Sequence, residues 1–381
     1  MRTLTDEEEA RAERLHRESL VIDSMGQFGP SVYTPEMLSR IDELAARGAS
    51  ASAIVVEMAT AVARALPRDD LPGFWEGWDQ AGVDVSSVTI GSFGQPPWSF
   101  ENAVRDAALF GELFDRLGDR LVRVSAPGDV ERARRDGKRG VILNFQNTLA
   151  IGDDLANLEL FHGVGLRIMQ LTYNERNLVG DGCTERVQAG LSHLGVAMVK
   201  RMNELGIMVD TGHCSDATTL DALEVSERPV AVSHSFCRSV SRHDRGKGDD
   251  VVRAVGEQGG FFGVVVVPFF ITDDPNATLD HWLAHVERAA ELAGPEHVGI
   301  GTDWGEELPK RLEDLLNEEM RAFGFREEHR VDWAATVGGY RSWREWPNLT
   351  RALVAAGFSD QEIQGFLGGN FRRVFEAAIA P

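Results

Sequence analysis

Two histidines and an aspartate stand where short apolar runs of this 381-residue chain end. His213 ends IMVDTGH, His234 stands in VAVSHS, and Asp303 stands in HVGIGTDW. Two neutral imidazoles and a carboxylate are a common ligand set for Zn²⁺, and they leave a fourth position for water. A metal bound there would lower the pKa of that water and supply hydroxide at neutral pH. The pattern indicates a metal-assisted hydrolytic site, and the alternative for each histidine is a satisfied core or surface residue.

Two more apolar runs end in polar residues, Gln146 in NFQN and Tyr173 in LTYNERN. Helical patterns alternate with the runs, as in Leu191–Leu205, and strands buried on both faces that alternate with helices indicate a parallel sheet. Eight such units predict a TIM (β/α)8 barrel, with an open doubly wound sheet as the alternative. The carboxyl ends of barrel strands meet at one face, so these polar residues should converge. The expected strands are Leu20–Met25, Val85–Ser92, Gly140–Phe145, Leu166–Tyr173, Ile207–His213, Pro229–Ser235, Phe261–Val267 and His297–Trp304.

The rest of the chain fits one domain that spans residues 1–381. Thr5 and Glu8 form the sequence signature of a capping box, which predicts a solvent-facing helix within residues 1–18. Leu121–Val124 is a candidate accessory strand, and Glu306–Trp346, rich in charge and Trp, is expected to be an insertion or lid after the last barrel strand. Three tryptophans could cover a substrate or pack in the core: Trp333, Trp343 and Trp346.

Composition narrows the class of partner. The chain has 39 Lys and Arg against 60 Asp and Glu, a formal charge of −21, which argues against nucleic acids and anionic membrane surfaces. The first twenty residues lack the apolar core of a signal peptide, and no apolar run reaches the length of a membrane span. Three cysteines make a disulfide framework improbable. A protein of the reducing cytoplasm that acts on a small molecule is expected.

Several segments resemble the renal (membrane) dipeptidases, metallopeptidase family M19. They are VDTGHCSDAT, VAVSHS, GIGTDW and LVAAGFSDQEIQGFLGGNFRRVF, and the likeness runs from about residue 18 to residue 378. The typical enzyme of that family is a TIM barrel with two zinc ions, bridged by a Glu and a hydroxide, that cleaves dipeptides. The resemblance therefore implies a dipeptidase-like hydrolase, and it also implies a possible homodimer.

The resemblance assigns roles to particular residues. His213 and His234 match the two histidines of one zinc, and Asp303 matches the aspartate that contacts the other zinc and handles the proton. Arg245 matches the arginine that holds the terminal carboxylate of the substrate, a role that suits a planar fork of donors. The alternative for Arg245 is an ordinary surface arginine.

Three positions depart from the family pattern. The metal-binding His-x-Asp pair of the first strand is replaced by Met25-Gly26-Gln27, and the bridging Glu of the third strand is Gln146. A neutral amide cannot balance two Zn²⁺ ions, and a thioether is a poor ligand for hard cations. Tyr173 replaces the His that polarises the scissile carbonyl, although its hydroxyl could still donate to an oxyanion. The sequence predicts one zinc ion or none.

The loop GDGCTER could compensate for the lost ligands. Cys183 as a thiolate or Glu185 as a carboxylate could complete a mononuclear site with the two histidines. The alternative is a Gly-rich turn in which Cys183 is a small buried filler and Glu185 pairs with Arg186 or Arg176.

Three functions remain open from the sequence. The first is a metal-dependent hydrolase of a small amide or dipeptide, with Asp303 as base and Tyr173, Arg245 and Gln146 orienting the substrate. The second is a metal-independent enzyme in which Asp303, His213 and Tyr173 do acid–base work on another small molecule. The third is a non-catalytic barrel that binds a ligand. The first predicts metal in the active protein, and the second predicts activity that survives chelation.

Overall fold

Eight parallel strands form a nearly closed barrel in the computed structural model, which describes residues 2–91, 99–303 and 306–380. The order around the barrel is β1-β2-β4-β5-β6-β7-β8-β9, and β3 pairs with β4 outside this path. The predicted TIM barrel is confirmed. The strands are β1 Ile22–Gly26, β2 Val85–Thr89, β3 Leu121–Arg123, β4 Arg139–Phe145, β5 Leu166–Gln170, β6 Met208–Asp210, β7 Ala231–Ser235, β8 Phe261–Val264 and β9 Val298–Ile300.

The strands coincide with the predicted apolar runs, including the accessory strand β3, but most end earlier than expected. β5 stops at Gln170 rather than Tyr173, and β6 stops at Asp210 rather than His213. Beyond β6 the chain leaves the ladder after Thr211, and the His213 N–H donates to the side chain of Gln170, at 3.1 Å from Oε1. The predicted ends Ser92 and Trp304 lie outside the described residues.

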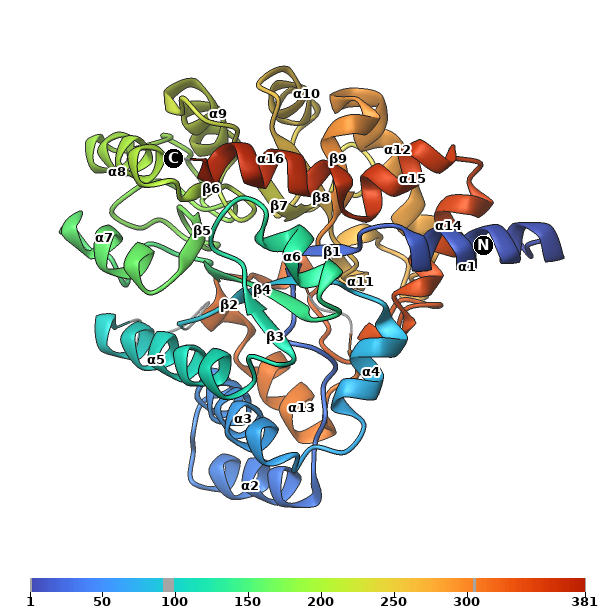
Figure 1. Cartoon of the computed structure of the whole chain (residues 1–381). Helices are drawn as coiled ribbons and strands as arrows, with labels where there is room; N and C mark the ends of the chain where they lie inside the picture. Colours follow the sequence, from blue (N-terminus) through green and yellow to red (C-terminus); the bar gives the residue numbers. More distant parts are fainter. Residues whose placement is uncertain (1, 92–98, 304–305, 381) are drawn as a thin grey trace.

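Helices surround the barrel, as Figure 1 shows. The capping box expected from sequence is present, with Thr5 and Glu8 at the start of α1. Ser215 caps α9. No helix within the described ranges is long and apolar enough to cross a membrane. The helices are α1 Asp6–Glu18, α2 Pro35–Ala46, α3 Ala51–Ala65, α4 Phe74–Ala81, α5 Phe100–Arg116, α6 Asp129–Arg135, α7 Ala156–Gly163, α8 His193–Leu205, α9 Asp216–Val225, α10 Asp249–Glu257, α11 Pro268–Ile271, α12 Leu279–Ala293, α13 Lys310–Glu318, α14 Pro347–Ala355, α15 Asp360–Gln364 and α16 Asn370–Ile379.

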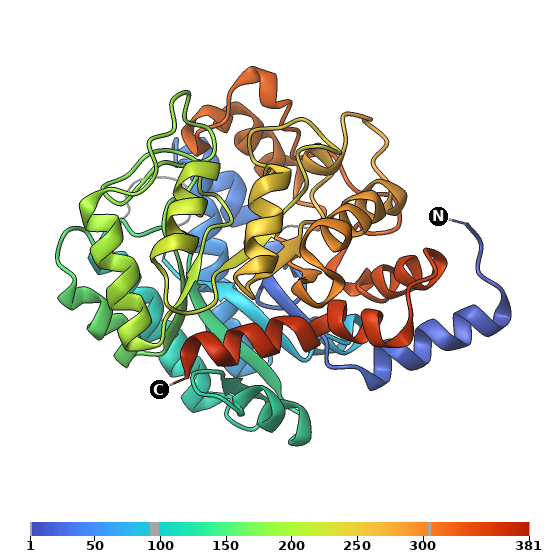
Figure 2. The same cartoon turned by 90° about the horizontal axis from the view of Figure 1, so that it is seen from above.

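The last helix, α16, closes the amino end of the barrel. Its Phe371, Val374 and Phe375 belong to one apolar cluster with strand residues such as Ile22 and Ile142. The chain approaches β1 closely just before this helix, because a Cβ at Gly368 would lie 2.6 Å from the Leu20 carbonyl oxygen. In Figure 2 the red α16 runs along one end of the molecule, while orange segments after β9 lie at the other. The insertion therefore lies at the carboxyl end of the barrel.

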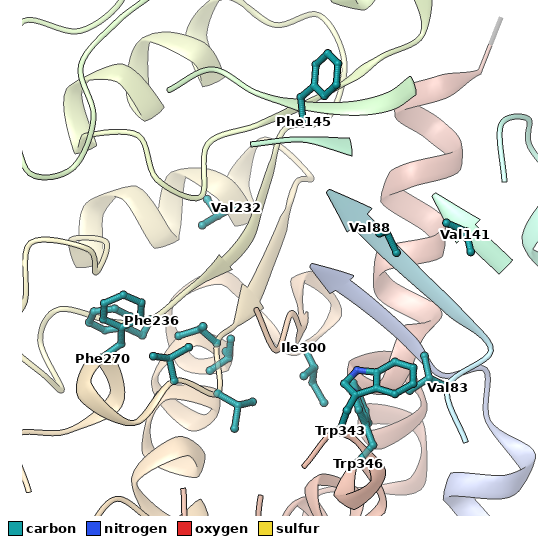
Figure 3. Close-up of a cluster of buried hydrophobic side chains, with 14 of the residues drawn as sticks. Val83, Val88, Val141, Phe145, Val232, Phe236, Phe270, Ile300, Trp343 and Trp346 are labelled. Atoms are coloured by element: carbon teal, nitrogen blue, oxygen red, sulfur yellow. The ribbon is translucent and has the colours of Figure 1, made fainter. Parts of the chain in front are cut away.

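A buried aspartate joins β9 to β1. The Asp303 N–H donates to the Met25 carbonyl at 2.7 Å, and Asp23 accepts from the Thr302 N–H at 2.9 Å and its hydroxyl at 2.6 Å. The indole N–H groups of Trp343 and Trp346 also donate to Asp23 Oδ2, each at 3.2 Å. Both indoles lie in the core beside Ile300 (Figure 3). Of the three tryptophans that could cover a substrate or pack in the core, Trp343 and Trp346 are thus core residues that close the barrel.

Candidate active site

A cavity of about 340 Å³ opens where the strands end. Three of the residues given a catalytic or substrate-binding role from sequence line it, Gln146, Tyr173 and Asp303. Gln27, which follows β1, lines it as well. The insertion supplies five further lining residues, Leu308, Leu312, Phe323, Phe325 and Trp333. The cavity therefore lies at the end of the barrel where TIM-barrel chemistry is found, between the strand ends and the insertion.

His213 and His234 face each other immediately behind this lining. Their Nε2 atoms are 2.9 Å apart, and the two rings are 2% and 0% exposed. The ring of Tyr173 stacks on His213 with centroids 4.1 Å apart, so Tyr173 stands between His213 and the cavity. The close approach requires Gly212, because a Cβ there would lie 3.0 Å from Nδ1 of His234. The structure thus brings together the two histidines expected to converge, and Gly212 allows their close approach.

The tautomer of His213 is fixed by Asn174. Asn174 Nδ2 donates to the Phe323 carbonyl at 2.7 Å, which turns its Oδ1 toward the imidazole. That oxygen lies 2.6 Å from His213 Nδ1 and can only accept, so Nδ1 carries the hydrogen. The lone pair of His213 is therefore on Nε2.

The tautomer of His234 is fixed by Ser233 and Asp210. The Ser233 hydroxyl donates to Asp210 Oδ2 at 2.6 Å, and this uses its only hydrogen. The same hydroxyl lies 2.7 Å from His234 Nδ1, so it accepts from that nitrogen. The lone pair of His234 is therefore also on Nε2.

Two lone pairs that meet at 2.9 Å repel each other unless a proton or a metal cation lies between them. Burial lowers the pKa of both imidazoles well below the usual value, and the positive charge of Arg245 lowers it further. Outer hydrogen bonds that fix Nδ1–H and present Nε2 are the usual arrangement around metal-binding histidines. His213 and His234 thus present two of the ligands that one metal ion would need.

The residues that would hold a second metal do not fit one. Gln146 Nε2 donates to Thr89 Oγ1 at 2.9 Å, and that hydroxyl lies 3.6 Å from Met25 Sδ. Gln27 Oε1 accepts from the Ser31 hydroxyl at 3.2 Å. Two neutral amides and a thioether supply no negative charge to balance a dication. Over the ranges that the structure describes, no group of three or more His, Cys, Asp or Glu is arranged to hold a metal ion.

The carboxyl group of Asp303 lies next to the histidines. Its Oδ1 lies 3.9 Å from His234 Nε2, its side chain is 23% exposed, and its backbone φ of 60° is left-handed. Burial raises its pKa to about 6, Arg245 opposes this rise, and the charge of Asp23 adds to it. A carboxyl group that titrates near neutrality can both accept and return a proton. Burial also raises the pKa of Tyr173, which keeps its hydroxyl a donor.

The candidate replacement ligands take other partners. Cys183 Sγ lies 3.3 Å from Asn174 Oδ1, and burial raises the pKa of the thiol to about 11. Glu185 Oε1 accepts from the backbone N–H of Arg176 at 2.8 Å. Neither side chain is among the described residues that line the cavity. Both contacts are those of a turn that holds Asn174 against His213.

Arg245 is fully buried and clamps two backbone loops. Its Nη1 donates to the Gly212 carbonyl at 2.5 Å and its Nη2 to the His234 carbonyl at 2.7 Å. The guanidinium carbon lies 5.7 Å from the centre of the Phe270 ring, and Phe270 lines the cavity. Arg245 is not among the described lining residues, and its two terminal nitrogens hold the segments that carry the histidines.

Sequence reasoning missed two sets of site residues. Asn174, Ser233 and Asp210 fix the imidazoles, yet they look like ordinary strand-end polar residues. The hairpin of α2 and α3 forms much of the cavity wall through Met37, Val55, Val56, Met58, Ala59, Thr60, Val62 and Ala63. Its sequence signal was the apolar spacing in ASAIVVEMATAVARA, which predicts a helix with a wide apolar face.

Known proteins are similar to this chain in sequence or in fold. The family model described as Membrane dipeptidase (Peptidase family M19) matches residues 79–320. Over 283 residues the chain is 29% identical to Dipeptidase verJ of Clonostachys rogersoniana, covering 73% of this chain and 66% of that protein. Over 334 residues it is 26% identical to Dipeptidase tcpJ of Claviceps purpurea, covering 82% of this chain and 71% of that protein. The chain thus spans about two thirds of the length of these relatives.

Among solved structures, the fold is similar to that of an amidohydrolase from Pseudomonas aeruginosa, with a TM-score of 0.76 and 24% identity. The match covers 97% of this chain and 99% of the amidohydrolase. At this identity the likeness shows the shared fold.

Proposed function

Since the chain belongs to peptidase family M19, the membrane dipeptidase family, we propose that it hydrolyses a small amide with the help of one metal ion. The observation that carries the proposal is the histidine pair, whose Nε2 lone pairs converge at 2.9 Å while both Nδ1 atoms are held by outer partners. Zinc suits two neutral imidazoles and open positions for water or substrate.

A zinc ion held by His213 and His234 would supply Lewis acidity and lower the pKa of a water molecule. The protein groups around it divide the remaining work. Asp303 takes a proton from the attacking water on Oδ1 and returns it to the leaving nitrogen, which its pKa of about 6 permits near neutral pH. Tyr173 donates its hydroxyl hydrogen to the carbonyl oxygen as negative charge develops there.

Gln146 suits the task of orienting the substrate. Its Nε2 is held by Thr89, while its Oε1 is buried with no hydrogen-bond partner among the described residues. A buried acceptor without a partner costs free energy, and an amide N–H of the substrate would satisfy it. The Gln at the family's bridging Glu position thus becomes a substrate acceptor.

The metal content of the purified chain tests the proposal. Protein made in zinc-supplemented medium should contain close to one zinc ion per chain, and His213→Ala and His234→Ala should each lose most of it. His193→Ala changes an exposed histidine and should keep it. Asp303→Asn should retain zinc and lose about 100-fold or more in turnover of an amide substrate. Active protein that contains far less than one metal ion per chain would refute the proposal.

A metal-independent enzyme is the second candidate. It is favoured by the burial of both histidines behind Tyr173 and by the lack of a third ligand among the described residues. Asp303 and Tyr173 would then do acid–base work alone on another small molecule. Activity that survives exhaustive treatment with EDTA would support this candidate over the first.

A further inference from the structure

The described lining of the cavity carries no positive charge. It includes no Lys, Arg or His, and its carboxylic acids are Asp106 and Asp303. The two internal segments outside the description, residues 92–98 and 304–305, contain no Lys, Arg or His in their sequence. A carboxylate that enters the cavity would therefore meet two acidic side chains and no basic one.

Arg245, whose guanidinium faces the Phe270 ring of the lining, holds two backbone carbonyls. Its Nη1 and Nη2 donate to the carbonyls of Gly212 and His234, and its Nε is buried with no hydrogen-bond partner among the described residues. The Phe270 ring lies over the guanidinium and lines the cavity. If Arg245 turned toward a substrate, it would leave the carbonyls of Gly212 and His234 without these donors.

The cavity wall is mainly apolar. Val55, Val56, Met58 and Val62 of α3 line it, and on the insertion side it is lined by Leu308, Leu312, Phe323, Phe325 and Trp333. Phe269 and Trp333 pack edge to face with centroids 5.6 Å apart. Such a wall gains free energy by burying an apolar ligand and loses it by burying an unpaired charge.

Asp106 is the charged group on the wall away from the histidines. It lies on α5, and its Oδ2 accepts from the Gly91 N–H at 2.8 Å. No Lys or Arg is paired with it among the ion pairs of the described residues. A positively charged group in the cavity would give this carboxylate a partner.

We propose that the substrate is an apolar amide without a free carboxylate. If the substrate carries a charge, the cavity favours the positive charge of a protonated amine. This inference rests on the proposed function and narrows its substrate class. It assigns Arg245 to positioning the two histidine loops rather than to binding a terminal carboxylate. The site would then prefer an amino-acid derivative whose terminal carboxyl group is capped as an amide or ester over a free dipeptide.

A matched pair of substrates tests the proposal. Leucyl-phenylalanine and leucyl-phenylalaninamide contain the same scissile bond and differ in the terminal carboxylate. The amide should be hydrolysed with a kcat/KM at least about tenfold higher. Equal rates, or a preference for the free dipeptide, would overturn the substrate class and leave the hydrolase function standing. If neither compound is hydrolysed, the chain does not cleave this dipeptide bond. The substrate class is then decided by a binding measurement.

Calorimetric titration of the full chain supplies that second readout. Phenylbutylamine, phenylbutanamide and phenylbutanoate share one apolar body, and the amine should bind most tightly and the carboxylate at least about tenfold more weakly. Asp106→Asn should weaken binding of the amine and leave binding of the neutral amide unchanged. Asp115→Asn removes an equal charge from an exposed site on the same helix and should change neither. Carboxylate binding as tight as amine binding would refute the inference.

Discussion

At the scale of single residues, His285 shows how burial sets a protonation state away from the cavity. Its Nδ1 accepts from the Cys237 N–H at 3.2 Å, and its Nε2 lies 2.9 Å from the Ile271 carbonyl. A second proton on this ring would face an N–H donor at Nδ1. Burial accordingly lowers the pKa of His285 to about 4, although the bond to Ile271 acts in the opposite direction.

This lowered pKa predicts a dependence of stability on pH. The unfolded ring titrates near 6.5, so the native state favours the neutral form, and the stabilisation is fully present above pH 6.5. As the pH falls from about 6.5 to about 4, this contribution to the free energy of unfolding decreases by about 3 kcal/mol in total. Urea unfolding of the native chain and of His285→Gln across this range measures it. Because other histidines titrate in both proteins, the difference between the two curves isolates His285, and a difference independent of pH would contradict the prediction.

The residue types of the site could be predicted from sequence, whereas their partners could not. His213, His234 and Asp303 follow apolar runs, and the barrel brings such strand ends together. The imidazoles are fixed by Asn174, which contacts His213, and by Ser233, which contacts His234 and is oriented by Asp210 on the neighbouring strand. No local pattern encodes that contact, because it depends on strand register.

At the scale of elements, the junction between β9 and β1 depends on one carboxyl group. Asp23 accepts four hydrogen bonds, two from Thr302 and one each from Trp343 and Trp346. The donors come from β9's carboxyl end and from the segment that precedes α14. Strand positions were predictable from apolar runs, but this junction was not, because its partners are some 280 to 320 residues apart in sequence.

Removing this carboxyl should weaken the whole barrel. Asp23→Ala leaves the buried donors of Thr302 and the two indoles without an acceptor, and the free energy of unfolding should fall by at least about 2 kcal/mol. Urea unfolding followed by tryptophan fluorescence measures the loss. Asp79→Ala removes an exposed carboxylate that pairs with Arg139 and should cost about 1 kcal/mol or less. Equal effects of the two substitutions would show that the junction contributes no special stability.

At the scale of the whole molecule, the two ends of the barrel have different roles. The amino end stabilises the fold, and the carboxyl end carries the candidate site. The amino end is filled by a continuous apolar cluster with α16, in which Phe375 is fully buried and stacks on Phe371. The carboxyl end holds the cavity, whose outer wall includes the partly exposed Trp333. The insertion side of this wall was predicted only as a possible lid, and the α2–α3 side was not predicted, since an apolar helix face does not reveal what it covers.

Substitutions at the two ends should therefore have opposite consequences. Phe375→Ala should lower the free energy of unfolding by about 3–5 kcal/mol, because a large cavity forms in packed core, and should leave phenylbutylamine affinity unchanged. Trp333→Ala should weaken phenylbutylamine binding several-fold and cost less stability, because this ring already borders open space. Urea unfolding and calorimetry on both variants separate the two effects. If Phe375→Ala weakened binding as much as Trp333→Ala, the two ends would be coupled through the strands, and the barrel would not be the rigid support that this division requires.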